Sequence, residues 1–187
     1  MEMTSTRTVP APVETVWAAL NDVDVLKSCI PGCDSIEPDG ENAYRIAMAA
    51  RVGPVAAKFS GRMQLADIDP PRGYTLSFDG QGGAAGFAKG EARVALAPTE
   101  NGAATALSYT VKASVGGKIA QIGSRLVDGA AQKLADDFFG RFSDAVAAKA
   151  GVEPVPAAPT PPQPWIRYVA IALLVVLLAF LFWQMKR

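Results

Sequence analysis

Apolar and polar positions alternate with a period of two through much of the chain between residues 44 and 113. In the clearest run, residues 55–65, apolar or small side chains at odd positions are interrupted by polar ones at Lys58, Ser60, Arg62 and Gln64. Such alternation is typical of strands with one buried face. Similar segments around Tyr44, Tyr74 and Tyr109 are separated by glycine, proline and asparagine turn signals. With a first strand over residues 2–9, the pattern predicts an antiparallel meander of about seven strands.

Helical spacing appears before and after these strands. Apolar residues recur at helical intervals in Val13–Leu20, and Asp22 is placed to cap a second short helix, Val23–Cys29. Residues 118–148 carry an apolar stripe that advances four residues at a time: Ile122, Leu126, Ala130, Leu134, Phe138 and Phe142. A stripe of this length needs a concave partner. We therefore predict an α+β fold in which the curved sheet wraps around a long C-terminal helix.

The composition divides the chain into a domain, a linker and an apolar tail. Residues 1–150 have the length of one ordinary domain, and six of the 14 residues in 151–164 are proline, which favours an extended polyproline linker. In residues 165–187, positions 168–183 carry no charge and correspond to about 24 Å of helix, against a hydrocarbon core of roughly 30 Å. Aromatic residues flank this run: Trp165, Tyr168 and Trp183. We expect a C-terminal transmembrane helix.

The start of the chain sets the expected orientation of this helix. Residues 1–8 show no basic segment followed by an apolar one, so no secretory signal is apparent. Flanking charge mildly favours the reverse orientation, because Lys186 and Arg187 follow the apolar run and only Arg167 precedes it. A domain of 150 residues needs a signal to cross a membrane. We therefore give the absence of a signal more weight than the flanking charge. We expect a single-pass protein of the cell membrane with its N-terminal domain in the cytoplasm.

Charge and residue usage exclude several classes of function. The chain carries 18 basic and 18 acidic residues, and no basic stripe marks a nucleic-acid surface. It contains no histidine, which removes histidine-dependent catalytic relays and histidine metal sites. Cys29 and Cys33 alone are too few for structural zinc, and cytoplasmic thiols are normally reduced. We expect no nucleic-acid partner, no bound metal and no disulfide.

Two glycine-containing turns are expected to border the interior of the domain. Residues 80–86 include four glycines, but they lie between two predicted strands and lack the Lys-Ser or Lys-Thr of a phosphate-binding loop. They predict a hairpin connection or an entrance flap. Residues 29–33, Cys-Ile-Pro-Gly-Cys, predict a turn at the opposite rim, and nothing nearby in sequence marks their thiols as redox-active.

A sheet wrapped around a helix encloses either a packed core or a cavity, and the same apolar side chains can line both. The candidates are aromatic, methionine and leucine residues: Phe59, Met63, Phe78, Phe87, Tyr109, Leu134, Phe138 and Phe142. Flexible methionines and flat aromatic rings suit a polyprenyl chain or a quinone ring, so these are our candidate ligand-binding residues. The alternative is that they pack against one another and leave no space.

Three stretches resemble the carbon monoxide dehydrogenase G-subunit family of the START-like helix-grip (SRPBCC) superfamily: VPAPVETVWAALNDVDVLKSCIPGC at 9–33, GQGGAAGFAKGEARV at 80–94 and GGKIAQIGSRLVDGAAQKLADDFFGRF at 116–142. The resemblance implies a helix-grip fold and a membrane-associated accessory protein that is not an enzyme and has no covalent cofactor. The implied partners are the bilayer, a quinone or isoprenoid lipid, and a molybdenum, flavin and iron–sulfur enzyme of the carbon monoxide dehydrogenase type. The protein would recruit that enzyme to the membrane or pass quinone to it.

Two alternatives stay open beside this ligand carrier. The domain can be a docking adaptor with a solid core and no ligand. It can also be a polyketide cyclase-like enzyme, as some relatives of this fold are. Without histidine, such an enzyme would depend on a buried carboxylate or tyrosine, and Glu91 and Tyr109 are the candidates.

Overall fold

The computed structural model describes residues 1–99 and 101–150. The predicted linker, 151–164, and the predicted transmembrane helix, 165–187, lie outside the described residues. Among the helices that are described, none combines the length and the apolar character needed to cross a membrane.

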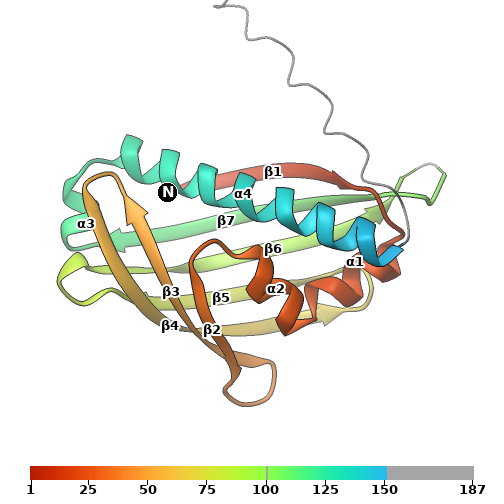
Figure 1. The fold of residues 1–187 in the computed structure, drawn as a ribbon, viewed down its shortest axis with the longest axis horizontal. Coiled ribbons are helices and arrows are strands. Elements are labelled where there is room, and N and C mark those ends of the chain that lie inside the picture. The colour runs from red at the N-terminus through yellow and green to blue at the C-terminus, as the bar shows by residue number, and fades with distance from the viewer. Residues whose placement is uncertain (100, 151–187) are drawn as a thin grey trace, which may run out of the picture. The chain divides into compact units, whose positions relative to one another are not determined.

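Seven strands form one antiparallel sheet, as the alternating pattern predicts (Figure 1). Their order across the sheet is β1-β7-β6-β5-β4-β3-β2. Each consecutive pair from β2 to β7 forms a hairpin, and β1 pairs with β7 as the edge strand next to it. The strands are β1 (Glu2–Val9), β2 (Cys33–Pro38), β3 (Ala43–Val52), β4 (Val55–Asp69), β5 (Gly73–Gln81), β6 (Phe87–Pro98) and β7 (Thr105–Gly116).

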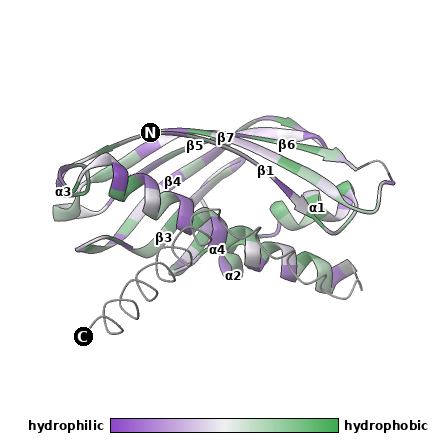
Figure 2. Ribbon diagram, turned by 90° about the horizontal axis from the view of Figure 1, so that it is seen from above, coloured by the Kyte–Doolittle hydropathy of each residue, from purple (hydrophilic) through white to green (hydrophobic). Residues whose placement is uncertain are grey.

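The strand register separates a concave apolar face from a convex polar face. Met63 lies opposite Phe78, Phe78 opposite Gly90, and Gly90 opposite Ala113, so this row points to one side of the sheet. The other side is polar, as in β1 and β7, where Thr6 and Ser108 share a hydrogen bond of 2.9 Å. Figure 2 shows the sheet arching over the longest helix, which lies on the concave side.

Two short helices follow β1 with the bounds expected from the sequence: α1 (Val13–Leu20) and α2 (Val23–Cys29). The side chain of Asp22 caps α2 by accepting hydrogen bonds from the backbone N–H groups of Asp24 and Val25, at 3.0 and 3.2 Å. A single 3-10 turn, η1 (Gly83–Ala85), lies in the glycine-rich connection between β5 and β6. That connection is therefore a hairpin loop.

The predicted C-terminal helix is two helices. A short α3 (Lys118–Gln121) is separated from α4 (Ser124–Ala150) by Gly123, whose φ of 96° lies in the left-handed region that ends helices. A stripe advancing by four residues drifts about 40° around a helix at each step, so it does not follow one buried face. Leu126 and Leu134 are accordingly 51% and 39% exposed, which corrects the expectation that the whole stripe is buried.

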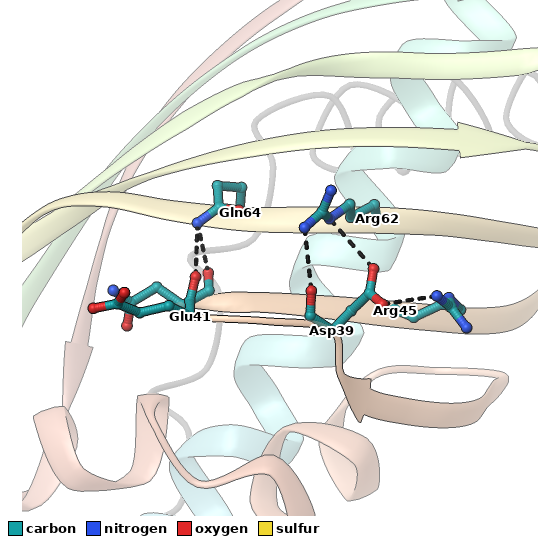
Figure 3. Close-up of polar contacts among 6 residues, drawn as sticks. Asp39, Glu41, Arg45, Arg62 and Gln64 are labelled. Atoms are coloured by element: carbon teal, nitrogen blue, oxygen red, sulfur yellow. Dashed lines mark hydrogen bonds and ion pairs between the residues drawn. The ribbon is translucent and has the colours of Figure 1, made fainter.

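A polar cluster fixes the turn between β2 and β3 against β4 (Figure 3). Asp39 accepts a hydrogen bond of 2.7 Å from Arg45, and its backbone carbonyl accepts one of 3.1 Å from Arg62. Gln64 donates to the backbone carbonyls of Glu41 and Asn42 at 3.1 and 3.2 Å. These contacts join the β2–β3 turn to β3 and β4.

Candidate ligand-binding site

Two packed clusters lie at opposite ends of α4. The larger one is built by β1, α1, β7 and the C-terminal half of α4, with Val9, Val16, Leu107, Phe142 and Val146 at its centre. The smaller one contains Ala85 of η1, Ile119 of α3 and Val127 of α4. Each cluster fixes one end of the helix against the sheet.

Between these clusters, the concave side carries apolar residues that are only half-buried. They belong to three neighbouring strands and share the inward face: Tyr44, Ile46, Met48, Met63, Leu65, Leu76 and Phe78. Among the described residues, neither cluster contains any of these side chains in its buried part. We call this surface the concave apolar face. Its side chains are directed toward α4, but α4 does not cover them fully.

Small side chains lie beside this face on both the sheet and the helix. Gly80 and Ala88 are opposite each other in the register of β5 and β6, and Ala130 and Ala131 are half-buried in α4. A Cβ built at Gly80 has Ala88 O as its nearest neighbour, at 3.6 Å, which is ordinary contact. Gly80 therefore leaves space that a larger residue would fill.

Glycine occupies positions 61 and 90 for a different structural reason. A Cβ at Gly61 would lie 2.4 Å from the carbonyl oxygen of Asp79, and one at Gly90 would lie 2.2 Å from that of Lys112. Both positions need glycine because neighbouring backbone approaches too closely for a side chain. They serve the curvature of the sheet.

The eight predicted site residues fall into four environments. Phe59, Met63 and Phe78 are half-buried on the concave side of the sheet, whereas Tyr109 and Phe142 are buried in the larger cluster. Phe138 is half-buried and packs against that cluster. Leu134 is exposed on α4. Phe87 is 36% exposed, and its side chain lies on the face of β6 that does not carry Ala88. The structure therefore brings two of the eight, Met63 and Phe78, to the concave apolar face. It packs Phe59 against the smaller cluster and places Phe87 on the other side of the sheet.

Stacked aromatic rings form one wall beside the concave apolar face. Tyr109 stacks on Phe139 with ring centroids 5.0 Å apart, and Phe138 meets Phe139 edge-on at the same distance. Phe138 also stacks on Phe142 at 5.6 Å. Such pairs favour a fixed arrangement of rings, so this wall is preformed.

A polar group that the strand pattern does not reveal lies within this wall. Arg7 of β1 forms an ion pair with Asp136 of α4, and Asp136 also accepts a hydrogen bond of 3.1 Å from Gln132. Burial acts to lower the pKa of Arg7, but its contacts with Asp136 and Tyr109 outweigh burial and raise that pKa above its usual value. The Tyr109 hydroxyl is buried and has no hydrogen-bond partner among the described residues. The group connects α4 to the edge strand β1.

Two other partly buried groups, Tyr74 and Cys33, have raised pKa values. Burial raises the pKa of Tyr74 to about 12, so its phenol stays protonated, and its ring meets Trp17 edge-on at 5.9 Å. Burial also raises the pKa of the Cys33 thiol, against the effect of Lys27 and together with that of Asp34. A raised thiol pKa disfavours the reactive thiolate. Both cysteines are free in the structure.

A hollow on the surface of the sheet is poorly suited to an apolar ligand. It has a volume of about 830 Å³, is wide and shallow, and crosses β5, β6, β7 and the start of β1. Five of its ten lining residues are charged: Glu2, Asp79, Lys89, Glu91 and Lys112. A lipophilic molecule would lose favourable hydration of these groups without replacing it.

Comparison with known proteins identifies the family. The sequence profile of the family described as the G subunit of carbon monoxide dehydrogenase (CoxG) matches residues 6–147. The chain belongs to this family. It is therefore related to accessory subunits of a carbon monoxide dehydrogenase system, as the resemblance in sequence implies. No curated protein matches the chain.

Solved structures confirm that the CoxG-family domain has the helix-grip type of fold. A conserved protein from Geobacillus kaustophilus is 35% identical, with a TM-score of 0.76, and the match covers 80% of this chain and 97% of that one. The ZhuI aromatase/cyclase from Streptomyces sp. R1128 is 16% identical, with a TM-score of 0.59, and the match covers 80% and 94%. The second similarity concerns the fold alone.

The candidate residues for a cyclase-like activity do not meet in this CoxG-family protein. Glu91 is exposed and lies opposite Lys112 on the convex face, whereas Tyr109 points to the concave side. The sheet separates their side chains, so they cannot act on one substrate. Among residues 1–99 and 101–150, no group of three or more potential metal ligands is found.

Proposed function

We propose that this protein binds a lipophilic ligand, a respiratory quinone or a related isoprenoid lipid, and couples a carbon monoxide dehydrogenase-type molybdenum hydroxylase to the membrane. The observation that carries the proposal is the concave apolar face, which is directed at α4 but is only half-buried. Apolar side chains in such a position gain about 25 cal/mol for each Å² that a ligand covers.

The chemistry of this face favours a flat ring with an apolar tail. Phe78 and the wall residue Phe138 offer ring faces, and Met48 and Met63 offer flexible thioethers that adapt to an irregular chain. No charged residue is a member of the concave apolar face. Fatty acids and lipid headgroups, which carry charge, are therefore less suitable ligands than a neutral quinone.

Membership of the CoxG family supports the link to a carbon monoxide dehydrogenase. The apolar segment at 165–187 supports attachment to a bilayer, because its length and aromatic flanks are those of a transmembrane helix. A quinone dissolves in the same bilayer. A domain held there can therefore exchange ligand with the membrane and electrons or quinone with a cytoplasmic enzyme.

The ligand is tested by filling the space at Gly80. Residues 1–151 are purified, extracted with organic solvent and analysed for bound lipids by mass spectrometry. We expect a near-stoichiometric quinone or isoprenoid in the wild type and at least a tenfold lower amount in Gly80→Leu, whose side chain projects beside Phe78. Ala95→Leu adds the same side chain on the exposed face of β6 and should keep the ligand. Wild-type domain without any bound lipid would leave only the docking adaptor.

Coupling to the enzyme is tested by pull-down. The domain should retain a carbon monoxide dehydrogenase-type enzyme containing molybdenum, flavin and iron–sulfur clusters. The Gly80→Leu variant should retain the enzyme equally well, because the substituted side chain lies on the concave side of the sheet. Failure of the wild-type domain to retain the purified enzyme under mild conditions would contradict the coupling role, whatever the result for the ligand.

A further inference from the structure

The connections of an antiparallel sheet emerge alternately at its two ends, and the two ends of this domain differ in charge. The β3–β4 turn, the η1 loop and the β7–α4 connection all lie at one end (Figure 1). We call the segments 50–57, 82–88 and 114–127 the basic end. They contain three of the 15 basic residues of residues 1–150, Arg51, Lys118 and Arg125, and none of the 17 acidic residues.

The turns at the other end have the opposite charge. Residues 38–43 contain Asp39 and Glu41, and residues 66–73 contain Asp67 and Asp69 against the single base Arg72. Arg51, Lys118 and Arg125 are all exposed, and no ion pair joins any of them to an acid among the described residues. The basic end therefore presents uncompensated positive charge on a domain whose total charge is slightly negative.

Exposed apolar side chains lie among these cations. Leu126, next to Arg125, is 51% exposed, and Phe87 beside the η1 loop is 36% exposed. The segments are in contact with one another, since a Cβ at Gly53 would lie 3.7 Å from Leu126 Cδ1 and 3.8 Å from Ile122 Cδ1. A half-open recess of about 260 Å³ lies at the same end. Four of its six lining residues are apolar, Met1, Val115, Ala120 and Val127, and the others are Ser124 and Asp128, an exposed acid just beyond the basic end.

We propose that the basic end is a membrane-docking surface for bilayers that contain anionic phospholipids. Exposed cations beside exposed leucine and phenylalanine side chains favour binding to the interface of such bilayers, by attraction to the headgroups and by shallow burial of apolar side chains. Loops without acidic residues are not repelled by anionic headgroups, and glycine-rich loops can adapt to a fluid bilayer surface. An acidic protein partner is less suitable, because these loops present few directed hydrogen-bond donors besides the three cations.

The docked orientation would place the half-open recess at the bilayer surface. The concave apolar face lies between the two clusters, and the buried residues of the smaller cluster, at the basic end, come from η1, α3 and the start of α4. A lipophilic molecule leaving the membrane would therefore meet this end of the domain first. Membrane docking goes beyond the proposed function, because it requires no ligand.

Vesicle binding by the isolated domain tests the proposal. Residues 1–151 are a suitable fragment, since the described part of the chain belongs to one compact unit and the Geobacillus protein is covered to 97% by a comparable length of this chain. We expect cosedimentation with vesicles of phosphatidylcholine and phosphatidylglycerol but not with phosphatidylcholine alone, and loss of binding at high salt. The triple variant R51Q/K118Q/R125Q should partition on the order of 100-fold more weakly, since each cation contributes roughly a fivefold effect. Leu126→Gln should weaken binding severalfold.

A matched control separates this surface from general electrostatics. The variant K27Q/R72Q/R93Q also loses three positive charges, but from exposed positions outside the basic end. Once the general effect of its more negative total charge is subtracted, its partition coefficient for vesicles should be within twofold of the wild-type value. Equal losses in both triple variants, or wild-type binding that does not depend on anionic lipid, would overturn the proposal. Gly80→Leu should bind vesicles normally while losing its ligand, and R51Q/K118Q/R125Q should keep its ligand, so failure of docking and failure of the proposed function are distinguishable.

Discussion

At the scale of single residues, Gly32 shows how the fold depends on positions where a side chain cannot exist. Its φ is 73°, and a Cβ there would lie 2.2 Å from the carbonyl oxygen of Ala49 on β3. Gly32 also accepts a hydrogen bond of 2.8 Å from the Ala49 N–H group. The turn at residues 29–33 is therefore joined to the sheet, which the sequence alone does not indicate.

Gly32→Ala should consequently destabilise the domain by several kcal/mol, because a left-handed conformation and a backbone clash act together. Gly102→Ala is the control. Gly102 has a similar φ of 68° but nothing within 4 Å of its Cβ position, so we expect a loss of only about 1 kcal/mol. Urea denaturation of residues 1–151 measures both. Equal losses would show that close packing against β3 adds nothing.

Residue positions also mark where prediction from sequence succeeds and where it does not. Met63 and Phe78 are placed correctly on the concave side because alternation within a strand is local. Phe87 is the first residue of β6, and the length and shape of the preceding glycine-rich loop decide which face it occupies. The ion pair between Arg7 and Asp136 joins residues 129 positions apart, so no local pattern reveals it.

At the scale of elements, Asp22 connects α2 to α4. Its carboxylate caps α2 and also accepts a hydrogen bond of 2.7 Å from Lys149 near the end of α4. The contact with Lys149 contributes most to lowering the Asp22 pKa below its ordinary value of 3.8, and the backbone N–H group of Val25 adds to it. Two helices distant in sequence thus share one charged residue.

Asp22→Asn should keep most of the cap and lose the charge, which makes it less stable than wild type at neutral pH. Because the folded pKa is lowered, the contribution of the charge is present above pH 3.8 and is lost as pH falls through the folded pKa. Thermal unfolding followed against pH should show the two proteins converging on acidification. A difference between wild type and Asp22→Asn that did not depend on pH would contradict the role of charge.

The elements themselves are mostly accessible from the sequence. Seven alternating or edge segments become seven strands, because half-buried antiparallel strands must alternate. The break at Gly123 escapes prediction because an apolar stripe spaced by four runs through it from Ile122 to Leu126. Leu134 is exposed for a related reason: the buried face of α4 follows the helical repeat of 3.6 residues, and the stripe does not.

At the scale of the whole molecule, the proposed roles require that one domain reach both a bilayer and an enzyme. α4 spans about 40 Å over its 27 residues and runs away from the basic end. A polyproline linker of 14 residues has a reach of about 43 Å. The predicted linker is therefore long enough for the predicted transmembrane helix and the basic end to engage the same membrane.

The meander topology has a further consequence for how the domain approaches a membrane. Since alternate turns lie at opposite ends of the strands, positive charge at one end and negative charge at the other make the domain an electric dipole along its strands. The N-terminus of α4, which begins at the basic end, adds its partial positive charge to the same pole. In the field of an anionic bilayer such a dipole experiences a torque, so the domain turns its loops toward the lipid before it touches them. Orientation would be biased before contact, so more collisions would begin near the productive geometry.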